Sequence, residues 1–516
     1  MILDPDALSA AGLAAFPTLD DLFRRAAARQ DDAVALCDPP DRMAITGEPP
    51  RRLTYAEADR TVGAIAARLR DIGLPTDAVI ATQLPNTVES VLMLLGIWRA
   101  GMIVAPLPML WRAEEIAAAV ECSGISALIT AARIGKTPQL AVAMQAAAAC
   151  FPIRHVGVFG PNDGDGVVSF DAVFDAAPTS IPNFSTARRD HAAAHTALLN
   201  FEMTAAGPVP LARSHLQVLA AAPALAAAGM LEKDGAILSA VPLASFAGVV
   251  LGLVNWLFNG GTLVLHHPFD ADAFAAQCRA HRCATVVLPG PVLPALAEAE
   301  LLAHRNGLRR VAALWRSASQ WRGAPRFAQQ AAPRLIDLLA LGEFAISAAP
   351  RAPDGIPDPA ALTIAGDHPS LTLARTRNDT LALRGAMLPA AAFPPGAMPA
   401  FARDADGFLD TGLALRPGDD STAIPLDQRV GLTRIGGYAL RAADIERLVA
   451  AADPYATVAV LPHGLTGSRL AGTSAQPAAV IEALASVNPL LGAAFIPRRG
   501  SAPEVAPEVA APAPQA

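Results

Sequence analysis

Lysine is almost absent from this 516-residue chain. Lys136 and Lys233 are the only lysines among 40 basic residues, and all the others are arginine. A genome-wide bias in base composition, which exchanges surface lysine codons for arginine codons, explains this composition in general. It also means that a mechanism requiring a lysine has only two positions to draw on, and none after residue 233.

Charged residues and cysteines are also scarce. Charged residues make up 17% of the chain and hydrophobic residues 53%, which excludes an intrinsically disordered protein. The net charge is −7 and there is no long basic run, so nucleic acid is not expected as a partner. The five cysteines are odd in number and unevenly spaced, which argues against a disulfide framework. We therefore expect a cytoplasmic protein that acts on small molecules.

No targeting signal is visible at the N-terminus, because the acidic start Met-Ile-Leu-Asp-Pro-Asp lacks a basic segment followed by an apolar one. Residues 236–265 carry no charge and are numerous enough to cross a bilayer. However, Pro242, Gly248, Asn255 and the Gly260-Gly261 pair interrupt this run. A buried strand–helix–strand unit explains it, with a membrane-associated segment as the alternative. We expect no membrane span.

Short apolar runs alternate with helical patterns along the first 315 residues. Thr54 and Glu57 have the spacing of a capping box and predict a helix that ends at Gly73. Asn86 and Glu89 repeat this spacing and predict a second helix, which ends near Arg99. Alternation of this kind predicts βαβ units and parallel sheets. The predicted strands are 78–84, 102–106, 127–130, 196–201, 236–240, 262–265, 285–288 and 310–314.

The last third of the chain differs in character. Residues 350–425 are rich in proline and predict a β-rich subdomain, and residues 429–500 predict a short α+β segment with a helix at 442–451 and a strand at 456–461. The predicted fold class is α/β. A large N-terminal domain (1–425) of stacked, mostly parallel sheets precedes a small, trimmed α+β domain (429–500) and a disordered Ala/Pro-rich tail (501–516).

Five segments occur in an order that is typical of one enzyme superfamily: 53–57, 83–108, 242–248, 260–274 and 436–446. In this order they resemble the class I adenylate-forming enzymes. This superfamily contains the AMP-forming acyl-CoA synthetases, the luciferases and the adenylation domains of peptide synthetases. The resemblance implies a carboxylic acid substrate, such as a fatty or aromatic acid, that is joined to AMP from ATP with Mg²⁺ and then transferred to a thiol such as CoA.

The nucleotide motifs of this superfamily are altered here. The phosphate loop, a Ser/Thr/Gly-rich run that ends in Gly-x-Pro-Lys, corresponds to residues 203–215, where Thr204 and Gly207 remain while Pro208 and Pro210 have no N–H to donate. The resemblance leaves Arg213 as the nearest substitute for the lost lysine. A loop retained only as a turn is the other interpretation.

The metal and ribose motifs are altered as well. Tyr-Gly-x-Thr-Glu, whose glutamate holds magnesium, corresponds to residues 341–345, so that Gly342 is kept and Glu343 stands two residues before the expected acid. Glu343 is thus either a substitute catalytic residue that takes over the metal-holding role from a shifted position or an ordinary polar residue. Thr-Gly-Asp, whose aspartate binds ribose, ends in Leu413, which leaves Asp410 as the substitute. Arg429 corresponds to the arginine that begins the hinge.

The resemblance also assigns a substrate pocket and a C-terminal motif. The pocket stretch written Pro-Leu-Phe-His-x-x-Gly corresponds to Pro242–Gly248 and yields Ala244, Ser245, Phe246 and Gly248 as pocket residues. The C-terminal motif is represented by Gly436, Gly437 and Glu446. Cys278, His281 and Cys283 do not have a zinc-binding spacing, and we predict no metal ligands among the candidate residues.

Two functions follow from the resemblance. One is an acyl-CoA synthetase-like ligase that handles an apolar carboxylic acid or acyl thioester, with ATP, Mg²⁺ and CoA as cofactors. The other is a pseudoenzyme without cofactors that binds an acyl ligand or regulates a partner protein. The family resemblance favours the first. The loss of acidic and basic side chains favours the second, because a genome-wide base-composition bias explains Lys-to-Arg exchanges but not Asp to Leu or Glu to Ala.

Overall fold

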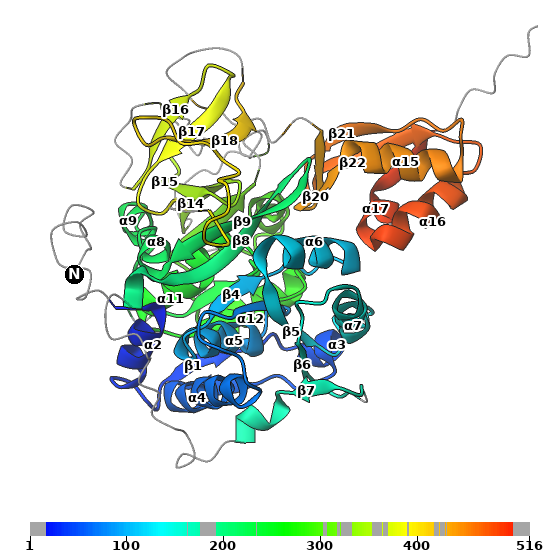
Figure 1. Ribbon diagram of the computed structural model, residues 1–516. Coiled ribbons are helices and arrows are strands. Elements are labelled where there is room, and N and C mark those ends of the chain that lie inside the picture. Colours follow the sequence, from blue (N-terminus) through cyan, green and yellow to red (C-terminus); the bar gives the residue numbers. More distant parts are fainter. Residues whose placement is uncertain are drawn as a thin grey trace, which may run out of the picture. The chain divides into compact units, whose positions relative to one another are not determined.

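The computed structural model describes residues 17–498 except 163, 176–191, 234, 303–306, 317–319, 321–332, 353–363, 365–369, 390–391, 417–422, 424–428 and 430. The chain divides into two compact units, Met1–Val430 and Gly431–Ala516 (Figure 1). The predicted tail at 501–516 lies outside the described residues.

One large sheet of the N-terminal unit has seven strands in the order β7-β6-β5-β3-β4-β8-β9. Neighbouring strands are parallel except β8 and β9, which form an antiparallel hairpin at one edge. Its inner strands are continuous buried runs, as expected where helices cover a parallel sheet. The strands are β3 (Val79–Gln83), β4 (Ile103–Pro106), β5 (Ile125–Ala131), β6 (His155–Phe159), β7 (Val167–Ser169), β8 (Thr196–Thr204) and β9 (Gly207–Ser214).

The second large sheet has eight strands in the order β15-β14-β13-β12-β10-β11-β1-β2. Its six central strands are parallel, and an antiparallel strand closes each edge. The two sheets confirm the predicted α/β class with mostly parallel strands. The strands are β1 (Val34–Cys37), β2 (Arg52–Thr54), β10 (Ile237–Ser239), β11 (Leu263–Leu265), β12 (Thr285–Pro289), β13 (Arg310–Trp315), β14 (Arg334–Leu341) and β15 (Ala345–Pro350).

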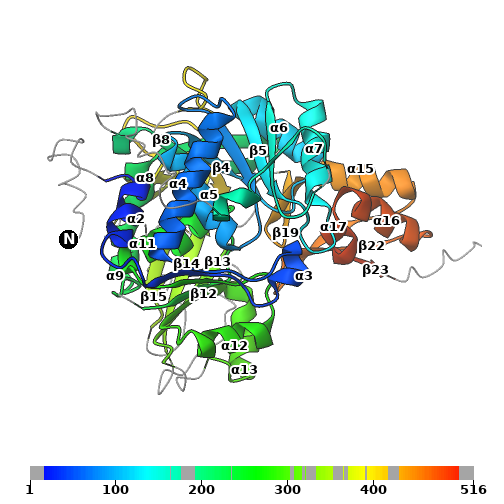
Figure 2. The same ribbon diagram turned by 90° about the horizontal axis from the view of Figure 1, so that it is seen from below.

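Helices cover the sheets of this unit. The two longest, α4 and α5, pack against each other, while α6 and α7 lie beside β5 (Figure 2). The helices are α2 (Leu19–Ala27), α3 (Arg42–Thr46), α4 (Tyr55–Asp71), α5 (Val88–Arg99), α6 (Ala113–Ser123), α7 (Gln139–Ala149), α8 (His215–Leu219), α9 (Ala222–Ala227), α12 (Ala271–Ala280) and α13 (Leu293–Glu298).

The two predicted helix starts have different outcomes. At α4, the Thr54 hydroxyl accepts the N–H of Glu57 and the Glu57 carboxylate accepts the N–H of Thr54, so the capping box is confirmed. At α5 the predicted cap at Asn86 is wrong, because the N-cap is Thr87. The Asn86 amide instead donates to the carbonyl oxygens of Ser239 and His266, at 2.8 and 3.2 Å.

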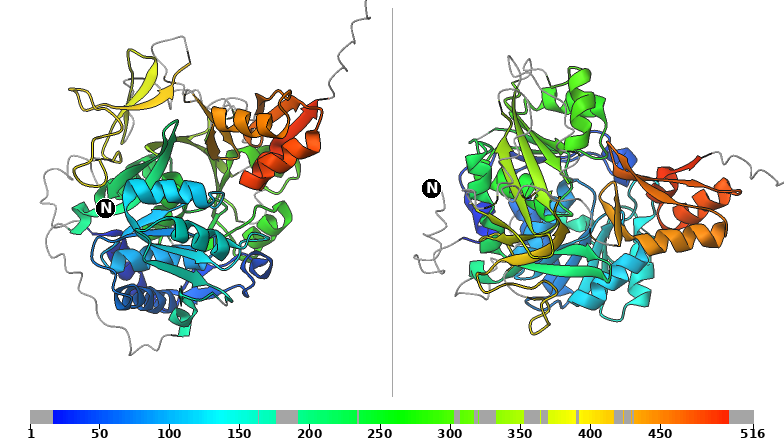
Figure 3. Two further views of the ribbon diagram at one scale, coloured as in Figure 1. Left: turned by 45° about the vertical axis from the view of Figure 1, so that its right-hand side comes forward. Right: turned by 90° about the horizontal axis from the view of Figure 1, so that it is seen from above.

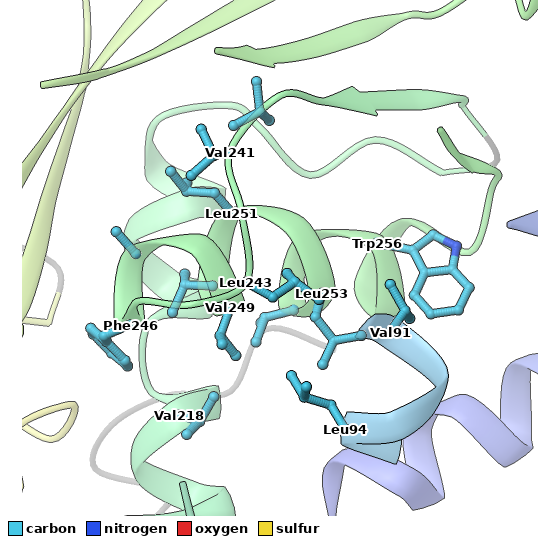
Figure 4. Close-up of a cluster of buried hydrophobic side chains, with 14 of the residues drawn as sticks. Val91, Leu94, Val218, Val241, Leu243, Phe246, Val249, Leu251, Leu253 and Trp256 are labelled. Atoms are coloured by element: carbon cyan, nitrogen blue, oxygen red, sulfur yellow. The ribbon is translucent and has the colours of Figure 1, made fainter. Parts of the chain in front are cut away.

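The uncharged run 236–265 forms a buried strand–helix–strand unit, as predicted. Between β10 and β11 it contains α10 (Phe246–Gly248), the π-helical segment η4 (Val249–Val254) and α11 (Asn255–Asn259). Figure 4 shows its apolar side chains gathered near Val218 of α8 and near Val91 and Leu94 of α5. Within the ranges that the structure describes, no helix combines the length and apolar character needed to cross a membrane.

A three-stranded antiparallel sheet completes the N-terminal unit and is coloured yellow to orange in Figure 3. It contains β16 (Thr372–Arg375), β17 (Thr380–Arg384) and β18 (Leu409–Ala414). The C-terminal unit has a two-stranded and a three-stranded sheet with three helices. Its elements are β19 (Leu432–Ile435), β20 (Tyr438–Arg441), α15 (Ala442–Ala452), β21 (Ala459–His463), β22 (Gly467–Thr473), α16 (Pro477–Val487), α17 (Pro489–Ala494) and β23 (Phe495–Arg498).

Candidate functional site

The segment expected to be the phosphate loop folds as a tight β-hairpin. β8 and β9 remain paired as far as Thr204 and Gly207, so that Ala205 and Ala206 alone form the turn. The Thr204 hydroxyl accepts the N–H of Ala206 at 3.2 Å and donates to the carbonyl of Gly207 at 2.9 Å. Gly207 has a φ of +120°, which favours glycine at this position. Both retained motif residues therefore serve the turn.

The two prolines of this segment lie on β9, the edge strand of the seven-stranded sheet. Pro208 and Pro210 are two positions apart, so their nitrogens face the same side of the strand. An edge strand tolerates proline because that side needs no ladder hydrogen bond. The same two positions have no N–H with which to bind a phosphate oxygen.

Glu202 is a buried carboxylate at the end of β8 and the centre of the candidate site. Its side chain is 1% exposed. Its carboxylate accepts the backbone N–H of Glu343 at 2.7 Å and lies 3.3 Å from Nε of Arg429. A backbone N–H together with a guanidinium is the donor set that proteins commonly offer to phosphate. Here a carboxylate of the protein accepts the backbone N–H and forms an ion pair with the guanidinium.

Arg213 on β9 is fully buried. Its guanidinium donates to the carbonyls of Glu343 and Phe344, both at 2.7 Å, and to that of Met387 at 2.9 Å. It also lies 3.9 Å from the centre of the Phe246 ring. Burial lowers the pKa of Arg213 to about 9, which leaves the group charged at neutral pH. Arg213 thus joins β9 to the 343–344 turn through its side chain.

Glu343 is turned towards the start of the buried helical run. Its carboxylate accepts the N–H of Phe246 at 2.7 Å and lies 3.7 Å from Nη1 of Arg316. Burial raises the pKa of Glu343, and the positive charge of Arg316 opposes that rise. A carboxylate at a helix N-terminus is stabilising because it accepts N–H groups that have no partner within the helix. The Glu343 carboxylate, which the resemblance suggested as a metal-holding group, therefore contacts the Phe246 N–H and Arg316.

The predicted substrate-pocket residues are packed closely. Ser245 caps α10 by accepting the N–H of Gly248 at 3.1 Å, and it also accepts from Arg316 at 3.1 Å. Phe246 is 1% exposed beneath Arg213. A Cβ atom at Gly248 would lie 1.9 Å from the carbonyl oxygen of Pro242, so only glycine fits there. Ala244 is partly buried.

The ribose-motif residues lie on and beside β18. The Asp410 carboxylate accepts the hydroxyl of Thr380 at 2.8 Å and the N–H of Gly412 at 2.9 Å. Arg429 donates to the carbonyl of Thr411, and its guanidinium lies 5.3 Å from the centre of the Phe401 ring. Gly342, with a φ of +57°, approaches Glu202 so closely that a Cβ there would lie 2.6 Å from its carboxylate.

The structure thus brings Arg213, Gly342, Glu343 and Arg429 together around Glu202, with Ser245 and Phe246 beside them. Gly436, Gly437 and Glu446 belong to the C-terminal unit. The two glycines, with φ of +57° and +85°, form the turn between β19 and β20, and Glu446 lies exposed on α15. In the part of the chain that the structure describes, no three acidic, histidine or cysteine side chains are grouped as a metal site would require.

Mg-ATP finds few suitable groups here. A phosphate group would have to compete with the Glu202 carboxylate for the Glu343 N–H and the Arg429 guanidinium. The hairpin also contains two prolines, which have no N–H to donate. Leu413 and Ala345 stand where the resemblance expects the ribose-binding and metal-holding acids, and neither side chain can accept a hydrogen bond. At these two positions the described residues therefore offer a nucleotide fewer hydrogen-bonding side chains than the motifs of the resemblance would provide.

Sequence reasoning did not identify Glu202 or Arg316 as site residues. Glu202 had a visible signal, since it is the one charged residue in the apolar strand 196–204. A charge in a strand that is otherwise buried requires a partner. Arg316 follows β13 and shows no comparable pattern.

The chain matches known adenylate-forming proteins in sequence. The family described as AMP-binding enzyme matches residues 23–198. Long-chain fatty acid transport protein 5 of Mus musculus is 28% identical over 303 residues, which cover 54% of this chain and 43% of that protein. Oxalate–CoA ligase of Arabidopsis thaliana is 27% identical over 227 residues, 44% of this chain and 42% of that protein. The matched regions span less than half of these relatives.

Solved structures agree in fold. Apo MbtA of Mycobacterium smegmatis has a TM-score of 0.64 at 21% identity, covering 96% of this chain and 94% of that one. The amide bond synthetase McbA of Marinactinospora thermotolerans has a TM-score of 0.69 at 18% identity, covering 92% and 95%. The resemblance is confirmed: this chain is similar in sequence, over residues 23–198, to the AMP-binding enzymes, and its fold is similar to that of solved adenylate-forming enzymes.

Proposed function

We propose that this chain binds an apolar carboxylic acid or its acyl thioester on an adenylate-forming fold and does not form an acyl-adenylate. The observation that carries the proposal is the position of Glu202. Its buried carboxylate accepts from the Glu343 N–H and lies against Arg429, so an internal anion uses the donors that a phosphate would need.

The ligand class is supported by the relatives. Their names include a long-chain fatty acid transport protein, an oxalate–CoA ligase and a 4-chlorobenzoate–CoA ligase of Arthrobacter, all of which refer to carboxylic acids. The last is 30% identical over 120 residues, which is 23% of this chain. An acid or acyl thioester is therefore the ligand class that we propose, and a protein partner that responds to its binding is compatible with it.

The competing function is an acyl-CoA synthetase with an altered ATP site. It would depend on Arg213 and Glu343 as substitutes for the lost cation and the lost metal-holding acid. Each already contacts backbone groups of the protein, at 2.7 Å in both cases. Binding of ATP by these groups would require those contacts to break, and this cost favours the binding protein.

Two measurements test the proposal. ATP–pyrophosphate exchange is assayed with the full chain across a panel of fatty and aromatic acids, and the thermal stability is measured with acids, acyl-CoA or Mg-ATP. We expect no exchange, stabilisation by acyl ligands and none by Mg-ATP, because a ligand stabilises only the state that binds it. Exchange that disappears in Glu343→Gln or Arg213→Gln would instead establish a rewired enzyme.

A further inference from the structure

A cavity of about 560 Å³ lies in the N-terminal unit between β9 and the proline-rich segment that precedes β18. Pro208, Val209 and Leu211 of β9 line one side, and Phe393 and Met398 contribute to the other. All the other described lining residues are apolar except Cys122 of α6 and Arg403. Its volume lies within the range of about 300–1,000 Å³ that is typical of small-molecule sites.

The sequence explains why β9 remains open on this side. An edge strand normally offers N–H groups to a neighbouring strand, but the prolines at 208 and 210 remove two of these donors. The strand therefore presents ring carbons and the Val209 side chain in their place. A polar ligand gains little from such a surface, whereas a hydrocarbon chain buries it favourably.

Arg403 is the one charged side chain among the described lining residues. Its guanidinium donates to the carbonyls of Pro389 and of Gly407, the latter at 3.1 Å. These two contacts use two of its five N–H donors, and both acceptors are uncharged. The cavity therefore combines apolar walls with one positive group, and among the residues that the structure describes no carboxylate forms an ion pair with it.

We propose that this cavity binds an aliphatic chain ending in a carboxylate, with the chain against Val209, Leu211 and Phe393 and the carboxylate on Arg403. The proposal takes its ligand class from the proposed function and adds the place of binding. This place differs from the one that the resemblance assigned, because residues 244–248 do not line the cavity.

Phe401 connects the cavity with the charged residues around Glu202. This ring lines the cavity, packs edge-on against Phe344 at 4.9 Å and faces the Arg429 guanidinium at 5.3 Å. A chain bound in the cavity would contact the outer face of this ring. Ligand binding would then stabilise the segment that precedes β18 together with the β8–β9 hairpin.

The test compares dodecanoate with dodecanol, which has the same chain length and no charge, by calorimetric titration of the full chain without ATP. In Arg403→Gln we expect dodecanoate to bind at least about tenfold more weakly, as is typical for loss of a hydrogen bond between charged groups, and dodecanol to bind unchanged. Val209→Asp should weaken both ligands. Arg384→Gln is the control, because Arg384 is an exposed arginine near Phe408 that does not line the cavity.

The outcomes separate this inference from the proposed function. Equal dodecanoate binding in wild type, Arg403→Gln and Val209→Asp would overturn the cavity and leave the proposed function intact. Equal weakening of dodecanol and dodecanoate in Arg403→Gln would show a structural role and overturn the carboxylate contact. Wild type that binds neither acids nor acyl-CoA would overturn both proposals. ATP–pyrophosphate exchange together with the expected Arg403 effect would overturn the proposed function alone.

Discussion

Residues 236–265 and residues 203–212 are both uncharged, yet they have different environments. The first run is buried, and its helical part packs against α5 and α8 (Figure 4). In the second run, residues 206–210 are partly exposed or exposed, and Pro208, Val209 and Pro210 face a cavity. An uncharged stretch thus indicates core where its apolar side chains pack against others. Where prolines leave the outer side of an edge strand unpaired, we propose that it forms a ligand surface instead.

Replacement of Trp256 by alanine should give the largest effect, because this side chain lies in the first run. It is fully buried, lies 5.7 Å from Tyr55 and 5.8 Å from Phe23 between ring centres, and donates to the carbonyl of Gly261. We expect the free energy of unfolding to fall by about 3–5 kcal/mol. Urea denaturation followed by circular dichroism measures this change.

Val209→Ala is the matched control for the second run and should change the unfolding free energy by less than about 1 kcal/mol, because the side chain faces a cavity. Similar losses in Trp256→Ala and Val209→Ala would contradict the distinction between core and ligand surface.

Removal of the Glu202 carboxylate should give the next largest effect. Glu202→Ala leaves the buried Glu343 N–H without this acceptor and Arg429 without this carboxylate, so we expect a loss of about 3 kcal/mol or more. Sulfate or pyrophosphate should restore part of the thermal stability of this variant and should stabilise wild type less.

Glu202→Gln keeps a hydrogen-bond acceptor and serves as the comparison. If neither anion stabilises Glu202→Ala more than wild type, the carboxylate does not occupy an anion site, and the main support for the proposed function is lost.

The pH dependence of stability should reveal a second buried carboxylate. Glu89 on α5 is 3% exposed on its side chain, and burial together with the neighbouring Asp38 raises its pKa from 4.5 to about 6, although Arg42 opposes this rise. A raised pKa means that the folded state prefers the protonated form. The stabilising contribution is therefore present below about pH 4.5 and is lost as the pH rises through 6.

This loss should be on the order of 2 kcal/mol, at about 1.4 kcal/mol per pKa unit. Thermal melts of wild type and Glu89→Gln between pH 4.5 and 7.5 measure it, and the difference between the two proteins should change across this window. Asp32→Asn, at an exposed carboxylate, is the control. A constant difference would show that Glu89 does not titrate there.

The sequence predicted the fold better than the site because the two depend on different information. Strands such as 285–288 and 310–314 are apolar runs between breaking residues, and the capping box of Thr54 and Glu57 is local, so neither needs knowledge of the rest of the chain. Asn86 was placed wrongly because its partners, Ser239 and His266, are more than 150 positions away.

The site depends on distant contacts of the same kind. Arg213 was selected as the cation nearest to the phosphate loop, but its contacts with Glu343, Phe344 and Met387 depend on segments that local patterns do not relate to β9. Family motifs identify the positions that meet. They do not reveal that Glu202, which no motif mentions, lies among them.

The smallest effect predicted for a site residue, apart from the controls, concerns Thr204 and distinguishes a turn from a phosphate loop. Among the described residues, its hydroxyl bonds within the hairpin alone, to Ala206 and Gly207, so Thr204→Ala should lower the unfolding free energy by about 1 kcal/mol. Thr376→Ala is the matched control, because its hydroxyl accepts the N–H groups of Asn378 and Thr380 in the turn between β16 and β17.

In a working phosphate loop, the same Thr204 substitution would leave stability nearly unchanged and weaken the binding of Mg-ATP. Thermal melts of Thr204→Ala with and without Mg-ATP therefore separate the two roles. A small stability loss that matches the Thr376 control, with no nucleotide effect in either protein, is the expected result. If Mg-ATP stabilises wild type but not Thr204→Ala, the hairpin is a functional phosphate loop. The exposure of residues 206–210, in contrast to the buried run 236–265, would then reflect nucleotide binding and not an unpaired edge strand.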